Sequence, residues 1–158
     1  MKTEKAIFGA GCFWHVQAEF DKIKGVISTR VGYAGGDESY DKLSYEEVCS
    51  DTTGHAEVVE VIFDSGKVSY EKLLEVFWKI HDPTTLNRQG ADIGGQYRSI
   101  ILYHNQKQKR LAISSKNEIE RKLWKKVVTE IMPAGKFYPA EEYHQKYLEK
   151  KGIASCTI

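Results

Sequence analysis

The chain has 158 residues, of which 41% are hydrophobic and 28% are charged, and its net charge at pH 7 is +1. This length and composition suit a globular protein with a sizeable core, and we expect residues 1–158 to form a single domain. The near balance of charge argues against a nucleic-acid-binding surface, which needs an excess of basic residues.

The chain contains three cysteines, Cys12, Cys49 and Cys156, an odd number spread along the sequence. This pattern argues against the disulfide framework of a small secreted domain. Too few apolar residues precede Gly9 for a secretory signal, and no segment approaches the roughly 18 apolar residues of a membrane span. We therefore expect a cytoplasmic protein that does not bind membranes.

The first third of the chain is expected to form a strand, a helix and a second strand. The segment AIFGAG at 6–11 is typical of a short buried strand that ends in glycines. The apolar residues that follow have the spacing of one face of an amphipathic helix: Phe13, Val16, Phe20 and Ile23. After Gly25, VISTRVGYAGG predicts a strand that runs into a glycine-rich loop. Residues 37–55 predict a long polar loop, and such loops are usually functional.

The rest of the chain begins with EVVEVIF at 57–63, which is apolar on both faces and predicts a central strand. Ser69 is a suitable N-cap for a helix that Asp82 and Pro83 stop. The remaining expected elements are a loop at 83–97, a strand at 98–104, a helix at about 106–124, a strand at 127–131, a loop at 133–139, a helix at about 140–150 and an irregular tail.

The order of elements is strand-helix-strand-strand-helix-strand-helix-strand, and few of the strands are joined by obvious parallel crossovers. This order disfavours a doubly wound sheet. We expect an α+β fold: a two-layer α/β sandwich with a ferredoxin-like mixed sheet, helices packed on the sheet and an irregular C-terminal tail.

Cys12 lies between a glycine-ended strand and the first turn of a helix. Free backbone N–H groups and the positive end of the helix dipole stabilise a thiolate at such a place. Glycines at 9 and 11 would let a substrate approach the backbone closely. We interpret Cys12 as a reactive thiol, and the alternative is a small buried apolar residue.

Two further residues are candidates for a functional role. Trp14 lies off the apolar face of the helix and could form a wall of a small pocket, or could simply pack half-buried on a loop. Glu57 shares a strand face with Val59 and Val61, where burial would raise its pKa to suit a proton donor. The alternative is that Glu57 lies at an exposed strand end.

Other residues give weaker signals. The five histidines show neither HExxH nor paired CxxC spacing, so no metal site is expected. GYAGG lacks the lysine and the helix of a phosphate-binding loop. Cys49 lies in the polar loop and has no evident role.

Several motifs together resemble the peptide methionine sulfoxide reductase A family. They are GCFW at 11–14, SYEEVCSDTTGHAE at 44–57, VFWKIHDP at 76–83, RQGADIGGQYRS at 88–99 and YHQKYL at 143–148. They occur in order over nearly the whole chain. The resemblance implies an α/β two-layer sandwich and an oxidoreductase that restores oxidised methionine, an activity of protein repair under oxidative stress.

The resemblance also implies roles for single residues. Cys12 matches the family nucleophile, Phe13 and Trp14 match the aromatic pocket for the methyl group of the substrate, and Glu57 matches the acid near the sulfoxide oxygen. Tyr45 and Tyr97 match two hydroxyls that hydrogen-bond to that oxygen, and Asp92 matches a supporting polar residue. Many members have Gly and Glu where this chain has His15 and Gln17.

The chemistry that the resemblance implies starts from the S epimer of methionine sulfoxide, free or in proteins and peptides. The Cys12 thiolate attacks sulfur while Glu57 protonates oxygen, and methionine leaves behind a sulfenic acid on Cys12. A second thiol then forms a disulfide, which a thioredoxin-type dithiol reduces. We expect no resident cofactor and a monomer.

Cys156 is the expected resolving cysteine. It lies in the tail GIASCTI, whose small residues predict mobility, and family members commonly carry recycling cysteines in such a segment. Recycling by an external thiol is the alternative.

Two other functions are weighed beside this one. A thiol peroxidase would need a polar pocket around Cys12 rather than the Phe13-Trp14 pair. A methionine- or peptide-binding adaptor would have an ordinary thiol, with a pKa near about 8.5.

Overall fold

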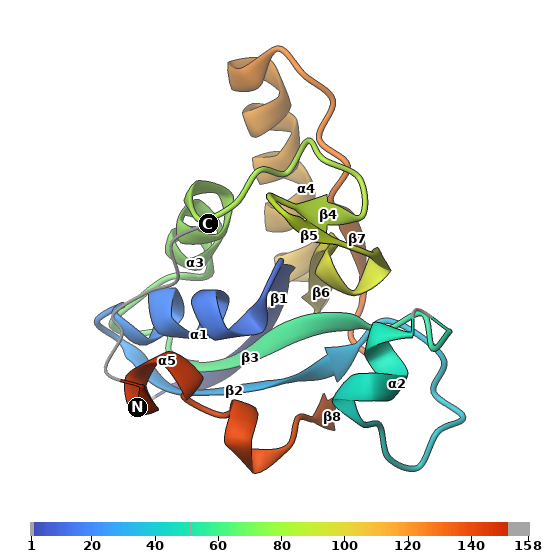
Figure 1. The fold of residues 1–158 in the computed structure, drawn as a ribbon. Helices are drawn as coiled ribbons and strands as arrows, with labels where there is room; N and C mark the ends of the chain where they lie inside the picture. The colour runs from blue at the N-terminus through green and yellow to red at the C-terminus, as the bar shows by residue number, and fades with distance from the viewer. Residues whose placement is uncertain (1, 51, 152–158) are drawn as a thin grey trace.

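The computed structural model describes residues 2–50 and 52–151 (Figure 1). The strands are β1 (Thr3–Ala10), β2 (Val26–Ala34), β3 (Ala56–Asp64), β4 (Arg88–Gln89), β5 (Asp92–Ile93), β6 (Ser99–Tyr103), β7 (Glu130–Pro133) and β8 (Tyr138–Pro139). The helices are α1 (Phe13–Asp21), α2 (Tyr45–Cys49), α3 (Tyr70–Lys79), α4 (Gln106–Leu123) and α5 (Tyr147–Lys150), with short 3-10 turns η1 (Gly95–Tyr97) and η2 (Glu142–His144). The expected irregular tail, with Cys156, lies outside the described residues.

The main sheet has six strands in the order β7-β6-β1-β3-β2-β8. Neighbouring strands are antiparallel except β6 and β7, so the sheet is mixed. Its inner strands follow the order β6-β1-β3-β2, with α1 between β1 and β2 in the chain and α3 between β3 and β6. This is the split βαβ arrangement. The predicted α+β fold with a ferredoxin-like mixed sheet is therefore confirmed.

The main core lies between one face of this sheet and the helices α1 and α3. Val59 and Val61 of β3 point to this face and are fully buried. Phe8 of β1 stacks on Phe20 of α1 with ring centroids 5.1 Å apart, and it contacts Phe77 of α3 at 5.3 Å. Figure 1 shows both helices on the same side of the sheet. The odd-numbered residues of β3, Glu57 among them, thus face the helices.

The opposite face of the sheet carries a smaller apolar cluster. Val58 of β3 and Ile100 of β6 belong to it, and Phe137 packs against it. The segment that contains Phe137 leads into β8, which pairs with β2 at Gly32 and Tyr33.

The prediction of one helix over 140–150 is wrong. The segment forms η2, a turn and the four residues of α5, with Lys146 at a left-handed φ of +55°. The Gln145 side chain bonds both the N–H and the carbonyl of Val31, at 2.9 Å each. These contacts hold the segment against β2 and replace the hydrogen bonds of a continuous helix.

The loops predicted at 37–55, 83–97 and 133–139 contain short elements. The first holds α2, which begins with a capping box between Ser44 and Glu47. The second holds the β4-β5 hairpin and η1, and the third holds β8. The sequence S-x-x-E that begins at Ser44 is typical of such a capping box and could have predicted α2 within the expected loop.

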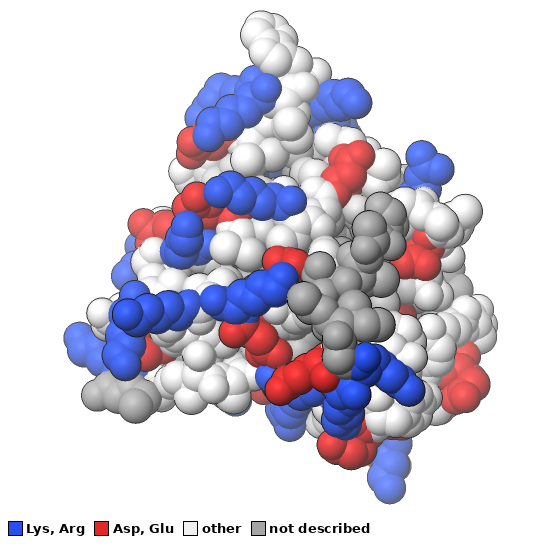
Figure 2. Space-filling view, turned by 60° about the vertical axis from the view of Figure 1, so that its left-hand side comes forward, with Lys and Arg blue, Asp and Glu red and all other residues white. Residues whose placement is uncertain are grey.

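The surface carries both signs of charge. Basic and acidic side chains lie next to one another over much of the face in Figure 2. Opposite charges on the surface of the molecule form ion pairs, as Lys79 does with Glu75 at 3.1 Å. No helix in the described part of the chain is long and apolar enough to cross a membrane.

Candidate active site

Cys12 is the N-cap residue of α1, as the sequence predicts, and lies just after the end of β1. Gly11 makes the turn with a φ of +96°, which favours glycine. The Cys12 carbonyl accepts a helical hydrogen bond from the Val16 N–H at 3.3 Å. A Cβ on Gly9 would lie 2.7 Å from Ile100, so this glycine is needed for packing rather than for access of a substrate.

The Cys12 thiol is less acidic than the sequence suggests. Burial, and after it the charge of Glu57, raises the pKa of Cys12 to about 12. The backbone N–H groups of Trp14 and His15 lower the pKa but do not outweigh these two effects. The N–H groups at the start of α1 thus favour the thiolate, as the sequence predicts, but burial and the Glu57 charge have the larger effect on the pKa of Cys12.

Glu57 is buried at the start of β3, with 1% of its surface exposed. Its Oε1 accepts a hydrogen bond from the Phe13 N–H at 3.3 Å, which joins it to the residue after Cys12. Burial raises the pKa of Glu57 to about 8; the charge of Asp92 adds to this shift and the Phe13 bond opposes it. The predicted inward-facing position of Glu57 is confirmed, the alternative of an exposed strand end is wrong, and the raised pKa agrees with the expected effect of burial.

Tyr45 and Tyr97 lie next to one another at the site. They come from the first residue of α2 and the last residue of η1, and their side chains hydrogen-bond. Burial and the Glu57 charge raise the pKa of both tyrosines, so both remain O–H donors. Asp92 of β5 is near enough for its charge to raise the pKa of Cys12 and Glu57. The structure thus brings together residues that are far apart in the sequence.

Phe13 and Trp14 have different surroundings although they are adjacent. Phe13 is 1% exposed and packs on Tyr33 of β2, with ring centroids 5.7 Å apart, so it belongs to the core. Trp14 is half-buried and lies parallel to the Tyr147 ring of α5 at 3.8 Å. The half-buried packing considered for Trp14 is therefore present, and its role as a pocket wall stays a prediction.

Arg98 holds together the loops that carry these residues. Its guanidinium donates to the carbonyls of Gly95 and Gly54 at 2.8 and 2.9 Å, and to that of Gly35 at 3.4 Å. It also pairs with Glu130 of β7 at 2.8 Å. One side chain therefore fixes three glycine-containing loops around Glu57.

The arrangement suits acid-assisted thiol chemistry. A thiol, a protonated carboxyl and two hydroxyls surround one place, so an oxygen-containing group there could receive a proton while sulfur is attacked. Within residues 2–50 and 52–151, no cluster of three His, Cys, Asp or Glu side chains could hold a metal ion.

A family model described as peptide methionine sulfoxide reductase matches residues 4–158. The chain belongs to this family. It is a peptide-methionine (S)-S-oxide reductase, an oxidoreductase. The relative named peptide methionine sulfoxide reductase MsrA from Methanothermobacter thermautotrophicus is 58% identical, over 99% of this chain and 93% of its own length. The MsrA of Geobacter sulfurreducens is also 58% identical, over 97% and 94%.

Solved structures of the same family share the fold of this reductase. The reduced form of Mxr1 from Saccharomyces cerevisiae superimposes with a TM-score of 0.91 at 36% identity, covering 96% of this chain and 87% of that one. The methionine sulfoxide reductase A of Corynebacterium diphtheriae has a TM-score of 0.85 at 34% identity, covering 98% and 77%.

Two residues of the reductase that had no role in the sequence-based picture lie at the site. Cys49 ends α2, and its thiol interacts with the Tyr45 hydroxyl and with Gln96, in the field of Glu57. His144 packs against the rings of Phe13 and Tyr45, at 5.2 and 4.8 Å. His144 belongs to the motif YHQKYL, and this motif could have pointed to a role for it. The capping box before Cys49 predicts the helix that presents the Cys49 thiol.

Proposed function

We propose that Cys12 is the nucleophile and Glu57 the proton donor in the reduction of methionine sulfoxide. The observation that carries this proposal is the buried Glu57 carboxyl, which is bonded to the backbone N–H directly after Cys12. Its pKa of about 8 leaves it mostly protonated near neutrality. An acid that keeps its proton at neutral pH is what the departure of a sulfoxide oxygen requires.

The proposed reaction begins with the sulfoxide oxygen between the Glu57 carboxyl and the hydroxyls of Tyr45 and Tyr97. Glu57 protonates this oxygen, and the two hydroxyls stabilise the charge that develops on it. Cys12 sulfur attacks the sulfoxide sulfur and forms an S–S bond while the S–O bond breaks, and the oxygen leaves as water with the proton of Glu57 and the proton of the Cys12 thiol. Water then attacks the Cys12 sulfur, the S–S bond breaks, and a proton returns to Glu57. Methionine, reduced by two electrons, is released, and Cys12, oxidised by two electrons, remains as a sulfenic acid.

The raised pKa of Cys12 also has a place in this reaction. Because the Glu57 charge is one of its causes, protonation of Glu57 makes the Cys12 thiolate easier to form. Asp92 opposes ionisation of both groups. We propose that Asp92 thereby helps to keep Glu57 protonated until the sulfoxide takes the proton.

Phe13 and Trp14 are proposed to hold the methyl group of the substrate. Both belong to the first turn of α1, directly after Cys12, so a methyl group between them would place its sulfur beside the thiol. The proposed substrates are free methionine sulfoxide and methionine sulfoxide in peptides and proteins.

Recycling is proposed to use Cys156 and a thioredoxin-type dithiol. Cys156 lies five positions after Lys151, which an extended chain spans in roughly 17 Å at about 3.3–3.6 Å per residue. Tyr147, at the start of the helix that ends at Lys150, stacks on Trp14, two residues from Cys12, which supports an attack of Cys156 on the sulfenic acid. Yeast Mxr1 has been solved in complex with Trx2, which supports thioredoxin as the class of reductant. We further propose that this single-domain protein works as a cytoplasmic monomer without a resident cofactor.

The experiment that tests the proposal is turnover of a peptide with the S epimer of methionine sulfoxide, with thioredoxin as reductant. Cys156→Ser should form one equivalent of methionine at the normal rate and then stall, because Cys156 acts only after methionine has left. Mass analysis of the wild type after one turnover should show a Cys12–Cys156 disulfide. A Cys12–Cys49 disulfide, or full thioredoxin-driven turnover of Cys156→Ser, would contradict the role of Cys156 and leave those of Cys12 and Glu57 intact.

Hydrogen peroxide is the matched substrate for the thiol peroxidase alternative. The proposal predicts that the protein consumes the sulfoxide peptide far faster than peroxide under the same conditions. The opposite preference would favour a peroxidase.

A further inference from the structure

The C-terminal end of α4 and the residues directly after it form an exposed segment that is both apolar and basic. Ala112 and Ile119, earlier in the helix, pack on the core, whereas every residue from 121 to 126 is exposed. Figure 1 shows this end of α4 projecting beyond the other elements of the molecule. We call residues 121–126, with the sequence RKLWKK, the helix-end patch.

Trp124 is the most exposed large apolar side chain in the described part of the chain. It is 93% exposed, and Leu123 before it is 45% exposed. The other two tryptophans, Trp14 and Trp78, are half-buried and buried. An indole ring in water forgoes one of the largest gains in free energy that a side chain can obtain from burial. Trp124 therefore contributes little to the core of this protein.

The backbone of Trp124 also has a conformation that disfavours a large side chain. Trp124 ends α4 in the left-handed region, with a φ of +54°, and its N–H donates to the Glu120 carbonyl at 3.0 Å. Glycine is the usual residue in this conformation at a helix end, because a Cβ there is strained. Neither the core nor the turn needs an indole at this position, which indicates a role outside the packing of this chain.

The charged residues of the helix-end patch are all basic. They are Arg121, Lys122, Lys125 and Lys126. Lys122 pairs with Glu118 at 3.4 Å, and the other three form no ion pair with the described residues. Figure 2 shows uncharged side chains at the top of the molecule, with basic side chains directly beneath them. The patch thus presents cations around an apolar tip.

The other acidic side chains near the helix-end patch are engaged by groups of their own surroundings. Oε2 of Glu120 accepts the Val127 N–H at 2.9 Å. Asp82 accepts hydrogen bonds from Thr84, and these lower the pKa of Asp82 more than the charge of Lys125 does. These carboxylates do not form close ion pairs with the patch.

Lysines elsewhere on the surface have closer acidic partners. Lys72 and Lys79 of α3 both pair with Glu75, at 3.6 and 3.1 Å. Lys146 pairs with Asp21 at 2.7 Å. The helix-end patch differs from these sites because it combines unpaired cations with an exposed aromatic ring.

This combination fits the interface of an anionic lipid bilayer. Tryptophan favours the level of the lipid headgroups, where its ring has apolar surroundings and its N–H reaches polar groups. Lysine and arginine beside it reach the lipid phosphates, and their alkyl stems cover apolar surface. Because the end of α4 projects, it can meet a flat surface before the body of the protein does.

Nucleic acid is the competing polyanion, and the helix-end patch suits it less well. Bases of a single strand stack on exposed aromatic rings, but proteins that bind such strands also provide a basic groove along the backbone. The four basic residues of the patch account for more than the whole net charge of +1, so the rest of the chain is net negative. A long polyanion would be repelled outside the patch, whereas a bilayer needs to meet only the tip.

We propose that the helix-end patch attaches the reductase peripherally to anionic lipid bilayers, with Leu123 and Trp124 at the level of the headgroups and the four basic side chains against lipid phosphates. The sequence argues against a spanning segment, and this attachment needs none. Figure 1 shows α1 and α2, which border the active site, far from this end of α4, so the site stays open. The inference does not depend on the roles proposed for Cys12 and Glu57.

The test is sedimentation of the full chain with vesicles of equal parts phosphatidylglycerol and phosphatidylcholine. The wild type should bind these vesicles, should not bind vesicles of phosphatidylcholine alone, and should be released by salt. Trp124→Gly should weaken binding by roughly tenfold or more, the effect of burying one large apolar side chain. Because glycine suits the left-handed turn, this variant should unfold in urea at no lower concentration than the wild type.

A matched pair of double variants tests the basic side chains. Lys125→Gln with Lys126→Gln should weaken binding roughly fivefold for each lysine, as expected for cations close to an anionic surface. Lys72→Gln with Lys79→Gln removes the same charge from α3 and should bind like the wild type. Equal weakening in the two double variants would overturn the inference, because binding would then follow the net charge and not the patch.

Fluorescence and turnover complete the test. Acrylamide should quench the part of the emission that Trp124→Gly lacks, and anionic vesicles should protect that part. Turnover of a soluble methionine sulfoxide peptide should be the same in the wild type and Trp124→Gly, and a loss in the variant would overturn the inference by giving Trp124 a role in the active site or the fold. Equal vesicle binding by these two proteins, no binding of the wild type, or binding to a single-stranded oligonucleotide in preference to anionic vesicles would also overturn it.

Discussion

The active site and the cluster around His81 are both buried and polar, yet they differ in how completely their polar atoms are paired. The His81 ring bonds the Phe77 carbonyl at 2.6 Å and the Ser99 hydroxyl at 2.7 Å. Ser99 in turn bonds Thr129 at 2.7 Å, and Lys116 donates to the Thr129 carbonyl at 3.1 Å. Burial lowers the pKa of His81 to about 4, so this histidine is a neutral structural element.

The active site leaves polar atoms without partners. Oε2 of Glu57, Oε1 of Gln96 and Nε2 of His144 are buried and unpaired among the described residues. Unpaired buried polar atoms cost stability, and proteins retain them chiefly where function requires them. The difference indicates that the His81 cluster stabilises the fold, whereas the active site awaits hydrogen bonds from its substrate. The buried, unpaired hydroxyl of Tyr70 is an exception, because it lies in α3 beside Phe8. Nδ1 of His15 in α1 is likewise buried and unpaired among the described residues, and no role is assigned to it.

The largest effect should come from removing the thiol. Cys12→Ser should abolish formation of methionine even in a single turnover, because a serine hydroxyl is a far weaker nucleophile toward sulfur. Cys49→Ser is the control, since it removes the other described thiol and should keep the single-turnover reaction. Methionine release by Cys12→Ser in a rapid-quench assay would contradict the assignment.

Glu57→Gln should slow the reductive step by roughly 10²–10⁴, because the amide keeps the shape of the side chain but cannot supply the proton. Glu60→Gln is a matched control on the same strand, where Glu60 pairs with Arg30 at 3.0 Å instead of facing the site. Single-turnover rates of the two variants give the comparison. Equal slowing of both would mean that Glu57 acts through stability alone.

Tyr97→Phe should reduce the rate by roughly 10²-fold, the low end of the cost of a transition-state donor, because Tyr45 remains. Tyr70→Phe is the control for the exception named above. It should leave the rate unchanged and raise the free energy of unfolding by about 1 kcal/mol or less, since it removes an unpaired hydroxyl. A rate loss in Tyr70→Phe would show that pairing does not distinguish the two kinds of residue.

Ser99→Ala should have the smallest effect on the reaction. It breaks the His81 cluster and should cost about 1–3 kcal/mol in the free energy of unfolding, because it leaves Nε2 of His81 unpaired. The single-turnover rate at a temperature where the variant is folded should stay near that of the wild type. Urea unfolding measures the loss of stability, and a rapid-quench assay on the same samples measures the single-turnover rate. A loss of rate without a loss of stability would mean that Ser99 serves the reaction rather than the fold.

The sequence predicts the parts of the site that belong to long, periodic elements. Cys12 follows from the end of a strand and the start of an apolar helical face, and Glu57 follows from the alternation of β3. The local signal at Cys12 did not reveal its high pKa, because burial and the Glu57 charge depend on contacts between distant segments.

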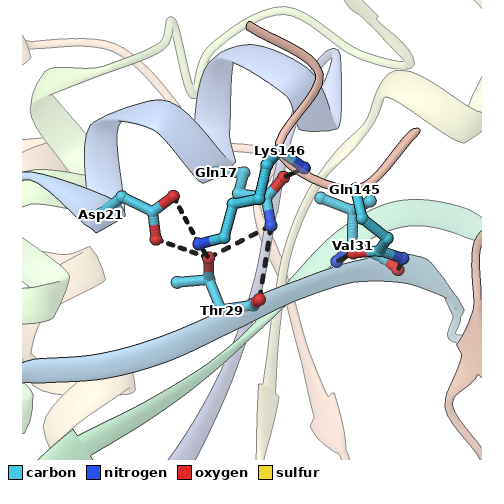
Figure 3. A network of polar contacts seen from close by, with 6 residues as sticks. All are labelled: Gln17, Asp21, Thr29, Val31, Gln145 and Lys146. Carbon is cyan, nitrogen blue, oxygen red and sulfur yellow. Dashed lines mark hydrogen bonds and ion pairs between the residues drawn. The ribbon is translucent and has the colours of Figure 1, made fainter. Parts of the chain in front are cut away.

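The loops were harder to predict. Tyr45, Tyr97 and Asp92 lie on elements of two to five residues, and only the family resemblance pointed to them. The position of His144, and the break in the helix expected over 140–150, depend on contacts of Gln145 with β2 and of Lys146 with α1 (Figure 3). Periodicity does not encode such long-range contacts, so it favoured a continuous helix.

The pH dependence of kcat/KM for the sulfoxide peptide tests most directly that protonated Glu57 drives the reaction. The pKa of Glu57, about 8, lies above its ordinary value, so its acid form is present at lower pH and is lost as the pH rises through about 8. The pKa of Cys12, about 12, is too high for the thiol to titrate in this pH range. Between about pH 7 and about pH 10, kcat/KM of the wild type should fall with an apparent pKa near 8, and Glu57→Gln should be slow without this alkaline limb. The same limb in Glu57→Gln, or a wild-type rate that stays level through pH 8, would contradict the account.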